Sequence, residues 1–214
     1  MAHSSQLTAI AGLILAGGDS RRLGQPKQML PYRDGTLLDH IIKEAEAVAD
    51  LDPLVVVLPP DVARVPDSTT QRALIVRRQQ ADGCSSSLHA GLDALPQHIA
   101  AIAVLPGDQP DLRRELISLA ARSWLSARPL ALTLSFQGKA GHPFIFSASL
   151  RDRLHALHGD KGMWRLLEEL GDEVARVEVD VILPRDIDTW EDYQRRAAIT
   201  PEGQRHRYPL RPAP

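Results

Sequence analysis

The sequence predicts an α/β fold with a mostly parallel sheet and helices on both of its faces. Short apolar runs alternate along the chain with longer segments in which apolar residues recur every three or four positions. Parallel strands need long crossover connections, which helices usually supply. The apolar runs show little alternation with polar residues, which is typical of strands buried on both sides.

The composition favours one domain that acts on a small molecule. The 214 residues are 43% hydrophobic, which is enough for one sizeable core. A formal net charge of −2 provides no broad basic surface of the kind that nucleic-acid binding requires. We expect a folded domain over residues 7–198 and a flexible tail over 199–214, where prolines and arginines lack apolar periodicity.

Cysteine usage and hydropathy point to a cytoplasmic protein. Cys84 is the single cysteine, so an internal disulfide framework is excluded, as is common in reducing compartments. No apolar run approaches the roughly 18 residues of a membrane span, and the first residues lack the pattern of a signal peptide. We therefore expect neither a membrane nor a nucleic acid as a partner.

The expected strands are short runs that end at glycine, proline or polar turns. The first ends at Gly17-Gly18, the second at Pro59-Pro60 and the fourth at Pro106-Gly107-Asp108. The runs cover residues 8–16, 54–58, 73–76, 100–105, 130–135, 143–147 and 173–181.

The expected helices carry their apolar residues on one side, and several begin at residues that can cap a helix. Thr36 is the cap expected for the first helix, and Asp111 is the cap expected for the third. The helical segments cover residues 36–49, a stretch from about 86, and then 111–126, 149–157, 162–170 and 189–197.

A glycine-rich loop with basic residues follows the first strand, in the segment LAGGDSRRLGQPK over residues 15–27. Glycines let the backbone come close to a ligand, so that successive amide N–H groups can point at phosphate oxygens. Two basic side chains would stabilise a triphosphate and the pyrophosphate that departs from it. The nucleotide-binding residues expected here are Leu15, Ala16, Gly17, Gly18, Ser20, Arg22, Gly24 and Lys27.

Two familiar phosphate loops are excluded by the residues themselves. A Walker A loop needs Gly-Lys-Ser or Gly-Lys-Thr, whereas Gly24 is followed here by Gln25-Pro26-Lys27. The dinucleotide fingerprint leads directly into a helix, whereas Pro26 and Pro31 precede the first helical segment of this chain.

The motif LAGG-x-S-x-R-L-G-x-x-K resembles the signature of the molybdenum cofactor nucleotidyltransferases and their sugar-nucleotide relatives. The resemblance extends over about residues 9–194 and implies a single-domain, Rossmann-like nucleotidyltransferase fold. It also implies that the glycines, Ser20, Arg22 and Lys27 hold the phosphates of a nucleoside triphosphate. This chain has Leu23 where methionine is usual, an exchange of one apolar residue for another.

Two acidic sites are expected to hold Mg²⁺. Asp108 follows a buried strand in LPGDQP, where its carboxylate is a hard oxygen ligand at the carboxyl end of the strand. Asp186 and Asp188 are two residues apart, so in an extended chain both carboxylates face one side. The resemblance implies that Asp108 and Asp188 bind the metal and that Asp108, Arg22 and Lys27 are catalytic. Metal binding by Asp186, and a role for Asp188-Thr189 as a plain helix start, stay open.

Small polar residues precede the second helix, where backbone amides and hydroxyls can bind a base or a ribose. The segment resembles the cytidylyltransferase branch of the family, which favours CTP over GTP. The residues concerned are Gly83, Ser85, Ser86 and Ser87, and a plain helix cap is the alternative.

Two further elements resemble the same branch, Gly-His-Pro at residues 141–143 and Gly-Asp-Lys-Gly at residues 159–162. The resemblance implies that His142 and Lys161 bind the acceptor, through its phosphate or through the edge of its pterin ring. A structural role is the alternative for His142. No HxxxH or CxxC pattern supports a zinc site.

Together these features predict a Mg²⁺-dependent enzyme that transfers CMP from CTP to molybdenum-loaded molybdopterin and releases pyrophosphate. A molybdoenzyme that receives the product is a further partner to consider. A GTP-dependent guanylyltransferase and a sugar-phosphate nucleotidyltransferase are alternatives with the same fold. A non-catalytic carrier of the cofactor and a nicotinamide-dependent enzyme are alternatives of other classes, and the latter lacks its fingerprint.

Overall fold

The computed structural model of the chain describes residues 9–18, 20, 22–60, 62, 72–78 and 83–197, with only the backbone described at residues 83 and 84. The segments expected to lie outside the domain, before residue 7 and over 199–214, fall outside the described residues.

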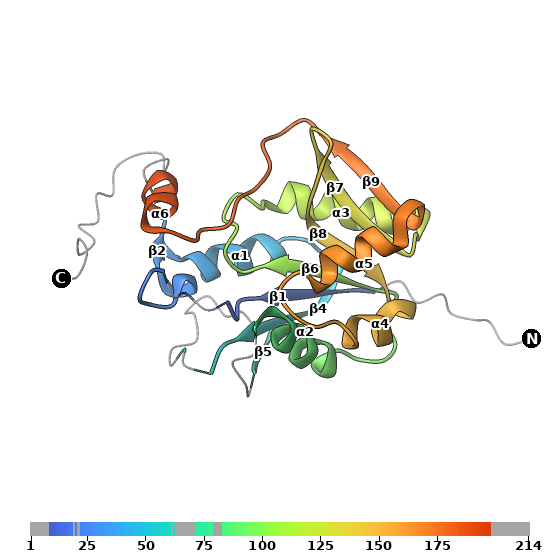
Figure 1. Cartoon of the computed structure of the whole chain (residues 1–214), viewed down its shortest axis with the longest axis horizontal. Coiled ribbons are helices and arrows are strands. Elements are labelled where there is room, and N and C mark those ends of the chain that lie inside the picture. Colours follow the sequence, from blue (N-terminus) through green and yellow to red (C-terminus); the bar gives the residue numbers. More distant parts are fainter. Residues whose placement is uncertain are drawn as a thin grey trace, which may run out of the picture.

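A seven-stranded sheet runs through the molecule (Figure 1). Neighbouring strands are parallel except at β8, which runs antiparallel to both of its neighbours, β6 and β7. The expected α/β class with a mostly parallel sheet is therefore confirmed. In their order across the sheet the strands are β5 (Ala73–Arg77), β4 (Leu51–Leu58), β1 (Ile10–Leu15), β6 (Ala101–Pro106), β8 (Lys139–Ser147), β7 (Ala131–Phe136) and β9 (Val174–Val179).

Helices cover both faces of this sheet, and each face has its own apolar core. Ile10 and Ile14 of β1 face one core, while Ala11 and Leu13 face the other, as alternation along a strand requires. The first core includes α1 (Leu37–Glu46) and α3 (Arg114–Ala127). The second includes α2 (Gly83–Ala94), α4 (Arg151–His155), α5 (Gly162–Leu170) and a 3-10 turn at Ala148–Leu150, whereas the 3-10 turn Gly171–Glu173 has no buried residue.

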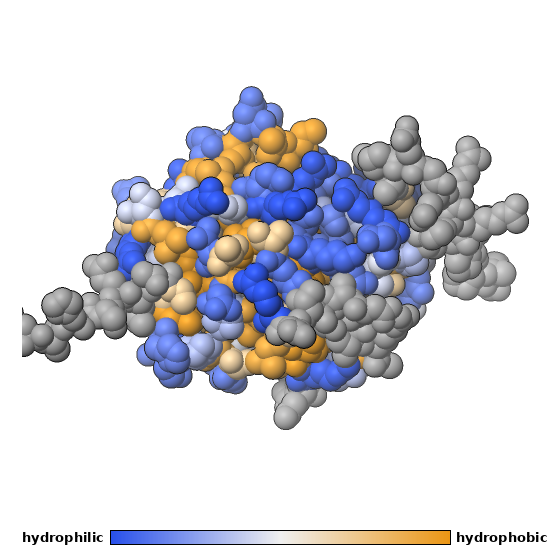
Figure 2. Space-filling view, turned by 180° about the vertical axis from the view of Figure 1, so that it is seen from behind, coloured by the Kyte–Doolittle hydropathy of each residue, from blue (hydrophilic) through white to orange (hydrophobic). Residues whose placement is uncertain are grey.

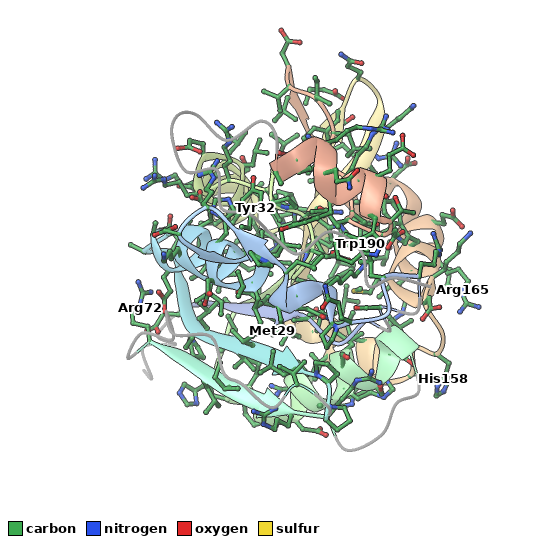
Figure 3. All side chains as sticks on the ribbon, turned by 90° about the vertical axis from the view of Figure 1, so that its left-hand side faces the viewer. Met29, Tyr32, Arg72, His158, Arg165 and Trp190 are labelled. Atoms are coloured by element: carbon green, nitrogen blue, oxygen red, sulfur yellow. The ribbon has the colours of Figure 1, made fainter. Side chains whose placement is uncertain are left out.

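A smaller apolar cluster lies beyond the carboxyl ends of the central strands. It joins residues around a hairpin of β2 (Pro31–Tyr32) and β3 (Gly35–Thr36), which follows a 3-10 turn (Lys27–Met29), to α6 (Trp190–Ala197). Figure 3 looks onto this end of the molecule and labels Tyr32 and Trp190, which both belong to the cluster. The hydroxyl of Tyr193 also donates to the carbonyl of Pro31 at 2.6 Å, so α6 is held against the hairpin.

The structure corrects one predicted cap and confirms another. Thr36 caps α1 in a capping box with Asp39, as expected. Asp111 does not cap α3, because the helix begins at Arg114 after Arg113 without a side-chain cap. The carboxylate of Asp111 instead lies 2.6 Å from the guanidinium of Arg196 in α6.

Strand β8 begins at Lys139, earlier than the predicted strand, which starts at Pro143. Residues 137 and 138 form a two-residue turn from β7, and both have positive φ angles, as tight hairpins require. Thr133 pairs with Phe144 but the next residue, Leu134, pairs with Gly141. His142 and Pro143 are therefore bulged out of the ladder, which is where a proline within a strand is tolerated.

The described helices include none that is both long and apolar enough to cross a membrane. On the face shown in Figure 2, hydrophobic residues are scattered between hydrophilic ones. That pattern is normal for a protein surface and does not by itself mark a binding site.

Candidate active site

A cavity of about 630 Å³ lies at the carboxyl ends of β1 and β6, where ligands bind in open α/β sheets. The glycine-rich loop, the turn after β6 and the segment before α6 all contribute to its wall. Its lining residues are Leu15, Gly17, Gly18, Ser20, Arg22, Lys27, Ser87, Val104, Pro106, Asp108, His142, Asp160, Met163, Trp164, Asp186 and Asp188.

The start of the glycine-rich loop is held tightly by side chains from two directions. Arg78, which is 3% exposed and follows β5, donates to the carbonyl of Gly17 at 2.7 Å and to the hydroxyl of Ser86 at 3.1 Å. Gln28 donates to the carbonyls of Ala16 and Gly18. The loop is thereby fixed on the outside, and its inner side remains free to line the cavity.

Position 17 needs a glycine because its neighbours leave no room for a Cβ atom, and not because its backbone angles are unusual. A Cβ atom at this position would lie 2.0 Å from the hydroxyl oxygen of Ser87 and 3.1 Å from Nε of Arg78. At Gly18 the nearest atom is Cε of Lys27, at 3.7 Å, an ordinary contact. The Ser87 hydroxyl is buried and has no hydrogen-bond partner within the described part of the chain, so a polar group is available at the start of α2.

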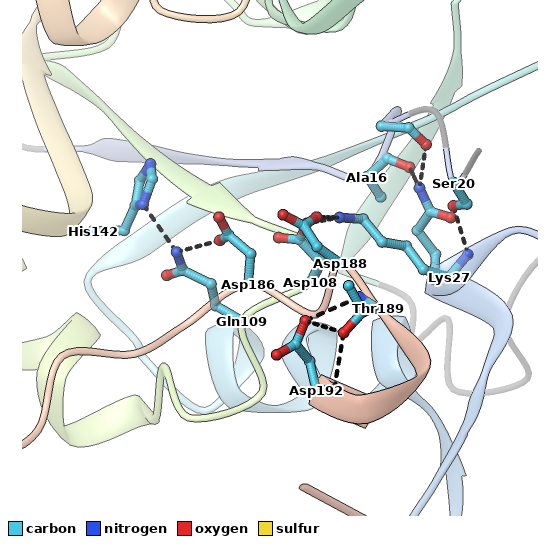
Figure 4. Close-up of polar contacts among 12 residues, drawn as sticks. Ala16, Ser20, Lys27, Asp108, Gln109, His142, Asp186, Asp188, Thr189 and Asp192 are labelled. Carbon is cyan, nitrogen blue, oxygen red and sulfur yellow. Dashed lines mark hydrogen bonds and ion pairs between the residues drawn. The ribbon is translucent and has the colours of Figure 1, made fainter. Parts of the chain in front are cut away.

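Lys27 lines the cavity and lies between two carboxylates (Figure 4). Its Nζ is 2.5 Å from Oδ2 of Asp108 and 2.9 Å from Oδ1 of Asp188. Its backbone N–H donates to the hydroxyl of Ser20 at 2.7 Å. Four residues predicted from three separate motifs are therefore brought together here.

The charges around Lys27 are predominantly negative. Burial alone would lower the pKa of Lys27, but the charges of Asp108 and Asp188, and their hydrogen bonds to it, outweigh burial and raise the pKa. Burial raises the pKa of Asp108, the nearby carboxylates of Asp186 and Asp188 act in the same direction, and Lys27 opposes them. One ammonium contacts two carboxylates, and a third, that of Asp186, lies nearby, an arrangement that favours the binding of a further cation.

The segment that carries Asp186 and Asp188 is extended, as the sequence predicts. Ile187 between them is buried in the small apolar cluster, and its N–H donates to the carbonyl of Asp108 at 3.1 Å. Both aspartates are exposed and line the cavity. Thr189 forms a capping box with Asp192, so capping of α6 does not involve Asp188.

His142 reaches the cavity from the bulge in β8 and is linked to the acidic group through Gln109 (Figure 4). The Nε2 of Gln109 donates to Asp186 at 2.7 Å and lies 3.4 Å from Nδ1 of His142. The ring of His142 packs on Phe144 with centroids 4.0 Å apart. Burial lowers the pKa of His142 to about 4, so the ring is neutral near pH 7.

Some predicted residues lie away from this cavity. Lys161 is exposed and precedes α5, outside the lining. Ser85 lines a small neighbouring pocket, and Ser86 is bound to Arg78. Gly24 has a φ of +69° and turns the loop without lining the cavity.

Sequence reasoning missed several residues around the cavity. Gln28 and Gln109 directly follow Lys27 and Asp108, so their proximity to motif residues was a usable signal. Arg78 and Trp164 lie outside every motif, and only the three-dimensional packing brings them close.

The residues present fit a magnesium ion bound together with a phosphate ligand. Among the described residues, no group of three His, Cys, Asp or Glu side chains is arranged to hold a metal. Mg²⁺ usually takes one or two protein carboxylates and completes its octahedral shell with water and substrate phosphates. Asp108 and Asp188, whose oxygens converge on the same lysine nitrogen, supply such a pair.

Comparisons with known proteins place the chain in a family. Residues 12–174 match the model of the MobA-like NTP transferase domain. The chain is similar to Rv0371c of Mycobacterium tuberculosis H37Rv, with 32% identity and a TM-score of 0.77 over 90% of this chain and 99% of that one. A structure of the same protein in complex with manganese is also similar, with 29% identity and a TM-score of 0.73 over 90% and 100% of the two chains.

Two curated relatives carry different activities in their names. A probable molybdenum cofactor guanylyltransferase of Bacillus mycoides (strain KBAB4) is 25% identical over 53% of this chain and 56% of its own length. The chain thus spans little more than half of that relative. The nicotine blue oxidoreductase of Paenarthrobacter nicotinovorans is 29% identical over 74% of this chain and 81% of its own length.

Proposed function

Because the chain belongs to the MobA-like NTP transferase domain family, we propose that it is a nucleotidyltransferase acting on a molybdopterin-type acceptor. It would join the nucleoside monophosphate of an NTP to the acceptor's phosphate and release pyrophosphate. The observation that carries the proposal is the position of the Lys27 ammonium, held between Asp108 and Asp188 beside the glycine-rich loop.

The residues of the cavity support an in-line transfer at the α-phosphorus. The triphosphate lies against the loop of Gly17 and Gly18, with Arg22 and Lys27 beside its negative charge. Mg²⁺ held by Asp108 and Asp188 would neutralise phosphate charge and align the two reacting groups. A phosphate oxygen of the acceptor forms the new P–O bond as the bond to pyrophosphate breaks. That oxygen is already ionised, so no general base is needed.

Two observations favour different bases for the nucleotide. The small hydroxyl residues Ser85, Ser86 and Ser87 at the start of α2 resemble the cytidylyltransferase pattern and favour CTP. The name of the Bacillus mycoides relative favours GTP instead. We therefore propose CTP as the donor, with GTP as the second candidate.

Other acceptors and other classes of function remain alternatives. A sugar-phosphate nucleotidyltransferase would use the same central residues with a different acceptor. A carrier of the finished cofactor would need no turnover, and the arrangement of Lys27 and Asp108 argues against it. The name of the oxidoreductase relative raises a redox reaction as a further activity to test.

Pyrophosphate release provides the decisive test. It is measured with Mg²⁺ and each of CTP, GTP, UTP and ATP, with and without molybdenum-loaded molybdopterin, for the wild type and Asp108→Ala. Lys43→Met serves as the matched control, because Lys43 forms an exposed ion pair with Asp34. We expect release that depends on the acceptor and on CTP, that is lost in Asp108→Ala and that is kept in the control.

Each other outcome has a definite meaning. Selectivity for GTP would replace the base assignment alone, and release with a sugar phosphate would replace the acceptor. Silence with all four nucleotides would contradict the molybdopterin-type acceptor and favour another acceptor or the carrier. Oxidation of NADH or NADPH, measured in parallel by absorbance, would favour the oxidoreductase.

A further inference from the structure

The end of the cavity formed by β8 and α5 differs in chemistry from the phosphate end. Its side chains are His142, Met163, Trp164 and Asp160, whereas the cations of the lining, Arg22 and Lys27, come from the glycine-rich loop. A ligand at the β8 and α5 end therefore meets aromatic, thioether and carboxylate groups and no positive charge from the lining. That environment does not suit a phosphate.

Trp164 exposes part of its side chain to the cavity, where a ligand could contact it. Five large hydrophobic side chains of the described residues are exposed, and Trp164, at 37%, is the one among them that lines the cavity. Its ring packs edge-to-face on Phe144, with centroids 4.7 Å apart and planes at 85°, and lies 6.1 Å from His142. The indole is thus supported from the core while remaining accessible to solvent. Such supported indoles provide large stacking surfaces.

The contacts of Gln109 fix which nitrogen of His142 can donate. A carboxylate only accepts, so the side-chain nitrogen of Gln109 must face Asp186, and its second hydrogen can point to Nδ1 of His142. Nδ1 is then the acceptor of the neutral ring and Nε2 carries the proton. Nε2 of His142 has no hydrogen-bond partner among the described residues. It does not count as a buried unpaired atom either, so it is accessible from the cavity that His142 lines. It is therefore a donor available in the cavity wall.

We propose that Trp164, His142 and Asp160 form a subsite for an uncharged, flat heteroaromatic ring of the acceptor. The ring stacks on Trp164, accepts a hydrogen bond from Nε2 of His142, and donates from an amide-like or amino edge to Asp160. Gln109 is a positioning residue that holds the tautomer of His142. A pterin ring has this combination of groups, whereas a sugar does not. The inference rests on the proposed function and places the acceptor's phosphate toward Lys27.

Binding of a free pterin tests the subsite without turnover. The probe is 6-hydroxymethylpterin, titrated by calorimetry into the full-length protein, with glucose 1-phosphate as the comparison ligand. Trp164→Phe keeps an aromatic face and the contact to Phe144, whereas Trp164→Leu keeps only apolar bulk. Trp190→Phe is the control, since Trp190 belongs to the small apolar cluster around α6.

We expect Trp164→Leu to weaken pterin binding at least about tenfold, and Trp164→Phe and Trp190→Phe to weaken it far less. Saturating CTP with Mg²⁺ should not displace the pterin. Equal affinity in Trp164→Leu and wild type, displacement by CTP, or preference for glucose 1-phosphate would each overturn the subsite. The protein could also bind pterin in a way that depends on Trp164 and yet release no pyrophosphate. That result would contradict the proposed function but support the subsite.

Discussion

Nζ of Lys27 lies 2.5 Å from Asp108 and 2.9 Å from Asp188, two carboxylates that are separated by eighty positions in the chain. The lysine therefore stands where a divalent cation would have to bind both carboxylates. Without the lysine, the two carboxylates and nearby Asp186 would repel one another. Lysine and metal are thus alternative counterions for the same acidic group.

Replacing Lys27 by methionine should make stability depend on metal. We expect the free energy of unfolding to fall by about 2 kcal/mol, because a partly buried carboxylate loses its partner. Mg²⁺ or Mn²⁺ should restore much of the loss, since a ligand that binds the folded state stabilises it. Thermal unfolding with and without metal measures both effects, and Lys43→Met should show neither. An equal metal response in Lys27→Met and wild type would contradict the idea of shared counterions.

Gly17 and Gly18 should respond differently to alanine. Gly17→Ala drives a Cβ to within 2.0 Å of the Ser87 hydroxyl, whereas Gly18→Ala meets its first atom at 3.7 Å. We expect Gly17→Ala to cost about 1–3 kcal/mol of stability and Gly18→Ala less than about 0.5 kcal/mol. Chemical denaturation of the single variants and of Gly17→Ala with Ser87→Ala measures this. The double variant should be more stable than Gly17→Ala alone, and strict additivity would rule out the predicted clash.

The positions of the strands and helices could be predicted because buried strands leave apolar runs and helices leave periodic ones. The hairpin of β2 and β3 was missed, because strands of two residues have too little sequence for any periodicity. The early start of β8 was missed because Pro143 reads as a strand boundary, whereas it occupies a bulge.

The centre of the site could be predicted because its residues lie in motifs at strand ends, whose carboxyl ends meet at one edge of the sheet. The sequence could not show why each glycine of the loop is needed. In the structure Gly17 has no room for a Cβ, whereas Gly24 has a positive φ. Arg78 could not be predicted as a support of the loop, because it is 61 positions from Gly17 in the sequence and nothing marks the pair.

Substitutions of Asp188 and Asp192 should affect metal binding and helix capping separately. Asp192 accepts from both the N–H and the hydroxyl of Thr189, so Asp192→Ala should lower stability by about 1 kcal/mol. Asp188→Asn leaves the capping box intact but removes a charge from the proposed metal site. We expect Mn²⁺ binding, followed by electron paramagnetic resonance, to weaken at least about tenfold in Asp188→Asn and little in Asp192→Ala. The reverse pattern would show that Asp188 is not the carboxylate that binds the metal.

His142 should make the protein less stable in mild acid. Burial lowers the pKa of its ring from 6.5 to about 4 in the folded state, while the unfolded chain keeps the ordinary value. Between these two values the unfolded state binds a proton that the folded state does not, so the free energy of unfolding falls as the pH falls from 6.5 to 4. The shift corresponds to at most about 3 kcal/mol, which is fully available above pH 6.5.

The variant His142→Gln removes this titration, and denaturant unfolding of wild type and variant at pH 7.5, 6, 5 and 4.5 isolates it from the titration of carboxylates. We expect the stability advantage of the wild type over His142→Gln to shrink steadily below pH 6.5. His158→Gln is the matched control, since it makes the same replacement at an exposed histidine outside the cavity. Parallel curves for wild type and His142→Gln would mean that the ring gains its proton as easily in the folded protein as in the unfolded chain.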